Sequence, residues 1–151
     1  MSSQAAVVYS ESNRVVASEG QIKEALEQGV NWSKYDGERV KGSNSDPIYL
    51  VLNGQLSWIP DSTTYNNLFA NWNNVVVSDY LVDNIPRGPA LSVGAVLAKG
   101  ATSAPVYLIT NGKKQWIPDP AVLAKFNFNG SKVVATPQVI IDAIPSGANV
   151  G

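Results

Sequence analysis

The stretch "IYLVLNGQLSWIPDS" at residues 48–62 occurs again as "VYLITNGKKQWIPDP" at residues 106–120. In both copies an apolar run precedes Asn-Gly, and a second short run ends in Trp-Ile-Pro-Asp. Asn-Gly between two such runs is the favoured dipeptide of a type I′ hairpin turn. Each copy therefore predicts a β-hairpin, and the constant offset between them predicts a duplicated structural unit.

A shorter valine-rich pattern occurs three times, each time followed by a glycine. The copies are VVAS at 15–18 with Gly29, VVVS at 75–78 with Gly88, and VVAT at 133–136 with Gly147. Three copies predict a pseudo-threefold repeat. The first unit lacks the Asn-Gly and Trp-Ile-Pro-Asp elements, so we expect it to be degenerate.

The strand signals predict the fold class. The last unit contains four strand-like runs: AVLAKG, VYLIT, KKQWIP and KVVAT. Four short strands in each of three units predict an all-β fold, a β-trefoil with helical turns in its loops, whose closure removes exposed edges. We expect one domain over residues 1–151, with units at about 1–36, 37–94 and 95–151.

The loops carry helix-start signals. Asp119 precedes Pro120, which is the pattern of an N-cap followed by proline in the first helical position, and Asp61 stands at the matching place in the other copy. Thr136 before Pro137 repeats the pattern. We therefore expect short helices after all three residues.

Trp58 and Trp116 occupy the same position in the two copies. An indole face can stack on a sugar ring, but a Trp repeated beside Ile and ahead of Pro is typical of a core position that recurs by symmetry. We expect both rings in the core, which makes the repeated stretch mostly scaffold. Replacing Trp116 with Ala should then cost about 3–5 kcal/mol.

The composition excludes several classes of function. The chain has no Cys and no His, so thiolate or imidazole metal sites and the Ser-His-Asp and Cys-His catalytic arrangements are excluded. The 11 Lys and Arg residues are scattered among 12 Asp and Glu, which argues against nucleic acid. Neither a basic leader nor an apolar run of about 18 residues occurs, so we expect a leaderless, soluble cytoplasmic protein that is not an enzyme and needs no cofactor or membrane.

Two loops place an aromatic ring between amide side chains: "NWN" at 71–73 and "NFN" at 127–129. Such a group can stack on a sugar and hydrogen-bond its hydroxyls. The candidate carbohydrate-binding residues are Asn71, Trp72, Asn73, Asn127, Phe128 and Asn129. The alternative is that both rings turn inward while the Asn residues form local turns.

Other aromatic residues lie in the least repetitive parts of the chain. They are Tyr9, Trp32, Tyr35, Tyr65 and Phe69. Because the repeated core does not require them, they are candidates for one apolar partner-binding face. The alternative is that they fill the space left by the missing strands of the first unit.

The threefold plan, the four strands per unit and the lack of cysteine resemble the β-trefoil lectin-like proteins of fungi, and more narrowly the light, lectin-like subunits of mushroom tyrosinases and their mannose-binding relatives. The resemblance implies a non-catalytic module that binds mannose-type glycans and docks on a larger catalytic subunit, a tyrosinase-type copper oxidase. The alternative is a β-trefoil protease inhibitor. Ricin-type trefoil lectins carry Gln-any-Trp in each unit, whereas Leu56 and Lys114 stand two residues before the repeated tryptophans here. The candidate sugar-binding residues are therefore those of the Asn-flanked loops.

Overall fold

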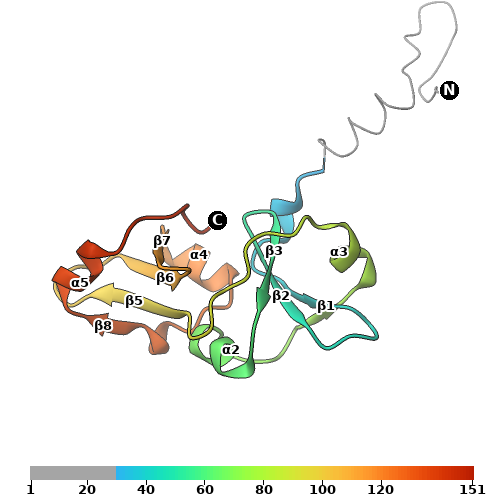
Figure 1. Ribbon diagram of the computed structural model, residues 1–151, viewed down its shortest axis with the longest axis horizontal. Coiled ribbons are helices and arrows are strands. Elements are labelled where there is room, and N and C mark those ends of the chain that lie inside the picture. Colours follow the sequence, from blue (N-terminus) through green and yellow to red (C-terminus); the bar gives the residue numbers. More distant parts are fainter. Residues whose placement is uncertain (1–29) are drawn as a thin grey trace, which may run out of the picture. The chain divides into compact units, whose positions relative to one another are not determined.

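Two copies of one strand and helix pattern follow each other along the chain, in the first repeat (37–94) and the second repeat (95–151) (Figure 1). The computed structural model describes residues 30–151. The strands are β1 (Arg39–Lys41), β2 (Ile48–Leu52), β3 (Gln55–Ile59), β4 (Val76–Val77), β5 (Val96–Gly100), β6 (Val106–Thr110), β7 (Lys113–Ile117) and β8 (Val134–Thr136). The helices are η1 (Trp32–Tyr35), α2 (Ser62–Leu68), α3 (Asp79–Asn84), α4 (Pro120–Lys125), η2 (Gly130–Lys132) and α5 (Gln138–Ala143).

Each repeat forms its own four-stranded sheet. The strand orders are β3-β2-β1-β4 and β7-β6-β5-β8, so the two sheets have the same topology. The first three strands of each repeat pair antiparallel, whereas β1 pairs with β4, and β5 with β8, in parallel. The described part of the chain is thus mostly β structure with short helices in the connections.

The sequence did not indicate the parallel pairs. It predicted the strands themselves, but β4 and β8 reach β1 and β5 only after the chain has passed through α2 or α4. A trefoil requires a third unit as well, and the predicted one covers residues 1–36, of which 1–29 lie outside the described residues. The trefoil therefore stays a prediction.

The hairpin turns form as predicted. Asn53 and Gly54 have φ values of 53° and 77°, and Asn111 and Gly112 have 55° and 72°. Positive φ at both central residues defines the type I′ turn, whose twist matches that of the strands it joins. These local sequences thus set the register of both hairpins.

The aspartate caps also form as predicted. The Asp61 side chain accepts a hydrogen bond from the Thr64 backbone N–H at 2.7 Å, and Asp119 accepts one from Val122 at 3.0 Å. The prediction that Thr136 caps a helix was wrong. Thr136 is the last residue of β8, and the N-cap of α5 is Pro137, which makes no side-chain capping hydrogen bond. A residue before proline favours extended backbone, which suits the end of a strand.

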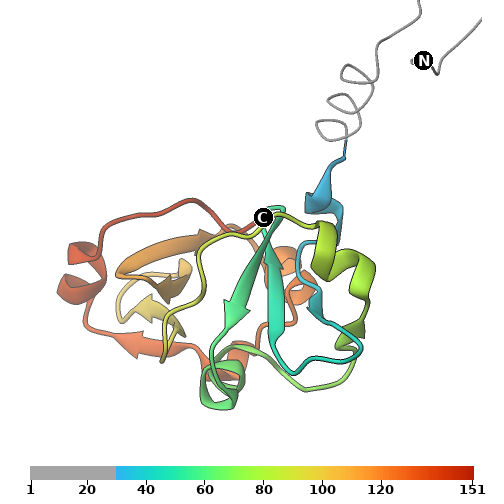
Figure 2. The same cartoon turned by 45° about the vertical axis from the view of Figure 1, so that its right-hand side comes forward.

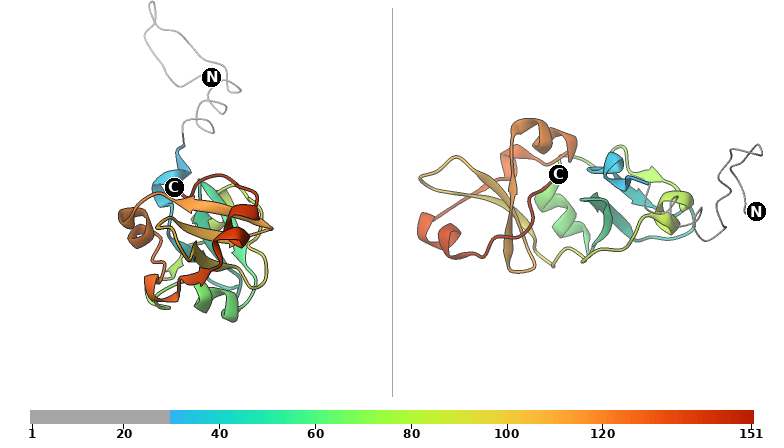
Figure 3. Two further views of the ribbon diagram at one scale, coloured as in Figure 1. Left: turned by 90° about the vertical axis from the view of Figure 1, so that its left-hand side faces the viewer. Right: turned by 90° about the horizontal axis from the view of Figure 1, so that it is seen from above.

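The two faces of each sheet pack against different partners. α3 lies against β1 and α5 against β5 (Figures 2 and 3). The opposite faces join a core that both repeats share, in which Leu50 and Leu108 are fully buried at equivalent positions. Its members are Leu50, Leu52, Ile59, Tyr65, Leu68, Phe69, Leu91, Ala95, Leu97, Leu108, Ile117, Phe126, Phe128 and Val150.

Backbone hydrogen bonds join the repeats beside this core. Phe69 and Phe128 form an antiparallel bridge. The Ala70 N–H donates to the Asn127 carbonyl at 2.9 Å, and the Asn129 N–H donates to the Leu68 carbonyl at 2.7 Å. Residues Trp32–Gly151 accordingly form one compact unit.

Candidate functional site

The two repeated tryptophans lie at the surface. Trp58 is 45% exposed and Trp116 is 41% exposed, so the prediction that they are core residues was wrong. Each lies on the last strand of its hairpin, directly opposite Tyr49 or Tyr107. On this face α3 lies against β1 and α5 against β5, two strands away from β3 and β7 in the strand order of each sheet.

Each indole borders a groove, and the two grooves are built from equivalent positions. The first groove has a volume of about 300 Å³ and is lined by Pro47, Trp58, Pro60, Tyr65 and Trp72, with Asp46, Ile48, Ile59, Asp61 and Ser62. The second has a volume of about 350 Å³ and is lined by Pro105, Trp116, Pro118 and Leu123, with Ala104, Val106, Ile117, Asp119 and Pro120. Proline and indole rings thus form the walls of both, and they lose little conformational entropy when a ligand binds.

A second indole makes the first groove the more elaborate one. The Trp72 ring stacks on Tyr65, with 3.8 Å between ring centroids and 17° between the planes. Trp72 Nε1 donates to Asn66 Oδ1 at 2.8 Å, and the Tyr65 hydroxyl donates to the Asn71 carbonyl at 2.8 Å. These contacts fix the orientation of Trp72 while leaving it 47% exposed.

The polar groups of the first groove lie at its edge. Asp46 and Ser62 are exposed, and Asp61 is engaged by its helix cap. Hydrogen bonds from the Thr64 backbone and side chain lower the pKa of Asp61, so its carboxylate is charged at neutral pH. In the second groove Asp119 is the acidic residue, and proline and alanine replace Ser62 and Asp46.

The predicted sugar-binding loops behave differently from each other. Asn71, Trp72 and Asn73 are all exposed, and Trp72 borders the first groove. Asn127 Nδ2 donates to Asn71 Oδ1 at 3.4 Å, so the structure brings the two loops together. Asn129 is half-buried, and its side chain accepts from the Ser131 N–H and hydroxyl, which makes it a local cap.

Phe128, a candidate sugar-binding residue, turns inward, as the alternative interpretation of its loop expects. It is 5% exposed and stacks between Phe69 and Phe126, at centroid distances of 5.6 and 5.5 Å. Asn127 has a φ of 55°, a left-handed conformation, and it directly precedes the bridge between Phe128 and Phe69. The second Asn-flanked loop therefore supplies a core residue where the first supplies an exposed indole.

The predicted partner-binding residues are split in the same way. Tyr65 and Phe69 are buried core residues, so they fill the interior as the alternative interpretation expects and do not form an exposed partner-binding face. Trp32 and Tyr35 are half-buried against the α3 side of the first sheet. Tyr9 lies outside the described residues.

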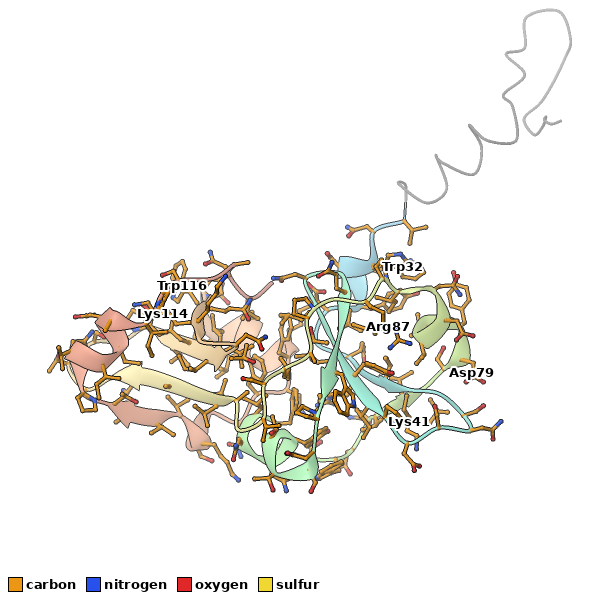
Figure 4. All side chains as sticks on the ribbon, in the orientation of Figure 1. Trp32, Lys41, Asp79, Arg87, Lys114 and Trp116 are labelled. Atoms are coloured by element: carbon orange, nitrogen blue, oxygen red, sulfur yellow. The ribbon has the colours of Figure 1, made fainter. Side chains whose placement is uncertain are left out.

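The sequence carried one signal for the exposure of the repeated indoles. Lys114 and Trp116 are two residues apart on β7, so they lie on the same face of the sheet (Figure 4). A lysine on that face indicates that the face is not buried along its whole length. Lys114 Nζ in fact donates to the Ile141 carbonyl at 2.8 Å and lies 5.2 Å from the centroid of Tyr107.

Residues 30–151 lack the features of two other kinds of functional segment. No group of three acidic side chains that could hold a metal ion occurs there. None of the helices in this part of the chain is long and apolar enough to cross a membrane. Comparisons with protein-family models, with curated proteins and with solved structures gave no match, so the two grooves are the basis for assigning a function.

Proposed function

We propose that this chain is a non-catalytic, lectin-like protein whose two tryptophan grooves bind the sugar rings of a glycan. The observation that carries the proposal is the exposure of an indole at the same position in both repeats. Exposed aromatic surface that recurs beside a groove is a feature of interaction sites. An indole face suits the C–H-rich face of a pyranose ring.

The first groove is the stronger site in this proposal. Trp58 and Trp72 supply two indoles to one groove of about 300 Å³. Asn71 and Asn73 flank Trp72, and amide groups both donate to and accept from sugar hydroxyls. The second groove has one indole and few polar groups, so it contributes a weaker subsite for the same glycan.

Mannose-type oligosaccharides are the first ligands to test, as the lectin-like resemblance implies. Two linked subsites on one chain raise the affinity for an oligosaccharide above that for a monosaccharide, provided that both are engaged together. A glycan array identifies the preferred sugar, and calorimetric titration with that sugar gives the affinity. Protease inhibition assays on the same sample test the inhibitor alternative.

The variants for this titration are Trp58→Ala, Trp72→Ala and Trp116→Ala. We expect Trp58→Ala and Trp72→Ala to weaken binding about tenfold or more, and Trp116→Ala to weaken it less, since stacked aromatic residues dominate such contacts. Tyr80→Ala is the matched control, because Tyr80 is 62% exposed but lines neither groove. A wild-type chain that binds no glycan, or three tryptophan variants that bind like the control, would overturn the proposal.

Docking on a larger catalytic subunit of the tyrosinase type is the second candidate function. The observation that favours it is an aromatic cluster beside the first sheet, in which the ring centroid of Trp32 lies 6.1 Å from those of Tyr35 and Tyr80. Co-elution of the chain with a stoichiometric larger protein, weakened by Tyr35→Ala without loss of folding, supports docking. A chain that elutes alone from its native extract contradicts it.

The trefoil belongs to the same lectin-like proposal. The two repeated four-stranded sheets support it. An experimental structure that includes residues 1–29 tests it. Twelve strands around one threefold axis would confirm the trefoil, and two four-stranded sheets with no third unit would contradict it.

A further inference from the structure

Arg39 is a charged residue in the shared core. It is 4% exposed and is the first residue of β1, paired with Leu50. The equivalent residue in the second repeat is Leu97, which is fully buried and paired with Leu108. The fold itself is therefore satisfied by leucine at this position, and the arginine is peculiar to the first repeat.

The guanidinium of Arg39 is only partly satisfied by its surroundings. Its Nη2 donates to the Asn73 carbonyl at 3.3 Å, while Nε and Nη1 are buried and have no hydrogen-bond partner in the described part of the chain. The guanidinium carbon lies 5.3 Å from the centroid of the Phe69 ring. A buried cation without an acidic partner costs several kcal/mol relative to an apolar residue, so its presence calls for a function.

Arg39 also lines a polar cleft of about 520 Å³ between the two repeats. Lys125, Asn74 and Asn127 line the same cleft, and none of its lining residues belongs to either tryptophan groove. Arg39 is otherwise enclosed, so a ligand would have to approach its guanidinium from this cleft.

The backbone holds the walls of this cleft in unusual conformations. Asn74 and Asn127 have φ values of 66° and 55°. Gly37 has a φ of 92°, and a side chain there would meet the Lys125 carbonyl. The chain thus brings the repeats into close contact at the cleft and places polar residues around it.

The charges around the cleft favour an anion at the arginine. Glu38 lines the cleft, but it precedes Arg39 in an extended segment and its side chain is exposed. Asp36 lies near Lys125 and accepts a hydrogen bond from the Gly54 N–H at 2.9 Å. Neither carboxylate is hydrogen-bonded to Arg39, whose planar donors match a carboxylate or a phosphate.

We infer that this cleft is an oxyanion site, separate from the tryptophan grooves, in which Arg39 binds a carboxylate or phosphate group of a small ligand and Lys125 assists it. The site is independent of the proposed sugar binding. A free anion and an acidic sugar both carry the required chemistry.

The test follows the Nε–H resonance of Arg39 by NMR while glucuronate, inorganic phosphate or glucose is added at constant ionic strength. The chain's other arginines are Arg14 and Arg87, and Arg39→Leu identifies the signal by its loss. We expect a saturable shift with glucuronate, phosphate or both, and none with glucose. Saturation by glucuronate alone assigns a carboxylate ligand, and saturation by phosphate alone assigns a phosphate.

Three variants control the titration, each followed on backbone amides of the cleft. Arg39→Leu introduces the residue found in the second repeat, so this variant should fold and lose the saturable response. Arg39→Lys keeps the positive charge without the planar donors, so it should bind the anion more weakly. Lys125→Gln changes an exposed residue and should weaken binding about tenfold, as expected for one charge-assisted hydrogen bond. No shift of wild-type Arg39 at anion concentrations up to about 10 mM, a range that detects millimolar affinity, would overturn the inference. An unchanged response in Arg39→Leu would also overturn it.

Discussion

At equivalent positions of their sheets and helices, the first repeat has Arg39 and Tyr65 where the second has Leu97 and Leu123. The hairpin turns, the aspartate caps and the strand order are the same in both. The second repeat shows what the scaffold requires, namely aliphatic residues at these positions. The polar and aromatic residues of the first repeat are additions to that scaffold, and they border a groove and a cleft.

The largest expected effect on stability comes from exchanging Arg39 of β1 and Leu97 of β5, the buried residues at equivalent positions of the two sheets. Leu97→Arg places an unpaired guanidinium in the fully buried part of the shared core, so we expect a loss of about 3–5 kcal/mol in the free energy of unfolding. Arg39→Leu should leave that free energy unchanged or raise it. Urea unfolding of both variants measures the difference, and a cost below about 1 kcal/mol for Leu97→Arg would show that this position tolerates cations in either repeat.

Tyr65→Phe makes the first groove more like the second by removing one hydroxyl. The hydroxyl donates to the Asn71 carbonyl at 2.8 Å, and its loss leaves that carbonyl without this partner. We expect a loss of about 1–2 kcal/mol in stability and weaker glycan binding at the first groove, because Asn71 precedes Trp72. Thermal unfolding and calorimetric titration measure the two effects. If both stay at wild-type values, the difference between the grooves does not depend on this contact.

Trp116→Ala tests the likeness between the repeats. Because the ring is 41% exposed, we expect a loss below about 1 kcal/mol, in contrast to the 3–5 kcal/mol that the sequence predicted for a core ring. Trp58→Ala should behave in the same way, since its exposure is similar. If Trp116→Ala lowers the melting temperature as much as a substitution in the core does, the Trp116 ring contributes to the stability of the fold as a core residue would.

The smallest effects are those of pH on Asp36, which directly precedes the first repeat, and on Asp61 within it. Burial raises the pKa of Asp36, so the folded state holds its proton more tightly and stability falls as pH rises above the ordinary value of 3.8. Hydrogen bonds lower the pKa of Asp61, so stability is full above 3.8 and falls as pH drops towards the folded pKa.

Asp36→Asn and Asp61→Asn should therefore change the pH dependence of stability in opposite directions. Urea unfolding between about pH 3 and about pH 7 measures both profiles, since the carboxylates titrate in this range. Gly94 stands directly before the second repeat as Asp36 stands directly before the first, so the Asp36 effect has no counterpart there. Profiles that change in the same direction would contradict the assignment of burial to one residue and capping to the other.

The sequence predicted the parts of the fold that depend on neighbouring residues. The Asn-Gly turns and the Asp caps are decided within a few residues, and they formed as expected. The exposure of Trp58 was not predictable in this way, because it depends on where α3 lies across the sheet. The inward turn of Phe128 likewise depends on its pairing with Phe69, which is distant in sequence.

The candidate site was predictable in part. Trp72 and its flanking Asn residues were found because an aromatic ring among amides is unusual in a loop. Arg39 was missed, although aligning the repeats places it opposite Leu97, and a charge opposite an apolar residue is a readable signal. The pocket that joins Trp58 to Trp72 arises only when α2 places Tyr65 in its wall and against the Trp72 ring.

The bridge between Phe69 and Phe128 has a consequence for how the protein unfolds. Neither repeat has a complete apolar interior without the other, because Tyr65, Leu68 and Phe69 of one pack with Phe126, Phe128 and Val150 of the other. Separating the repeats would expose these rings and break the backbone hydrogen bonds beside them. Residues Trp32–Gly151 should therefore melt in a single cooperative transition, with calorimetric and van't Hoff enthalpies that agree. Duplication in this chain has produced two halves that depend on each other for folding while their surfaces are free to diverge.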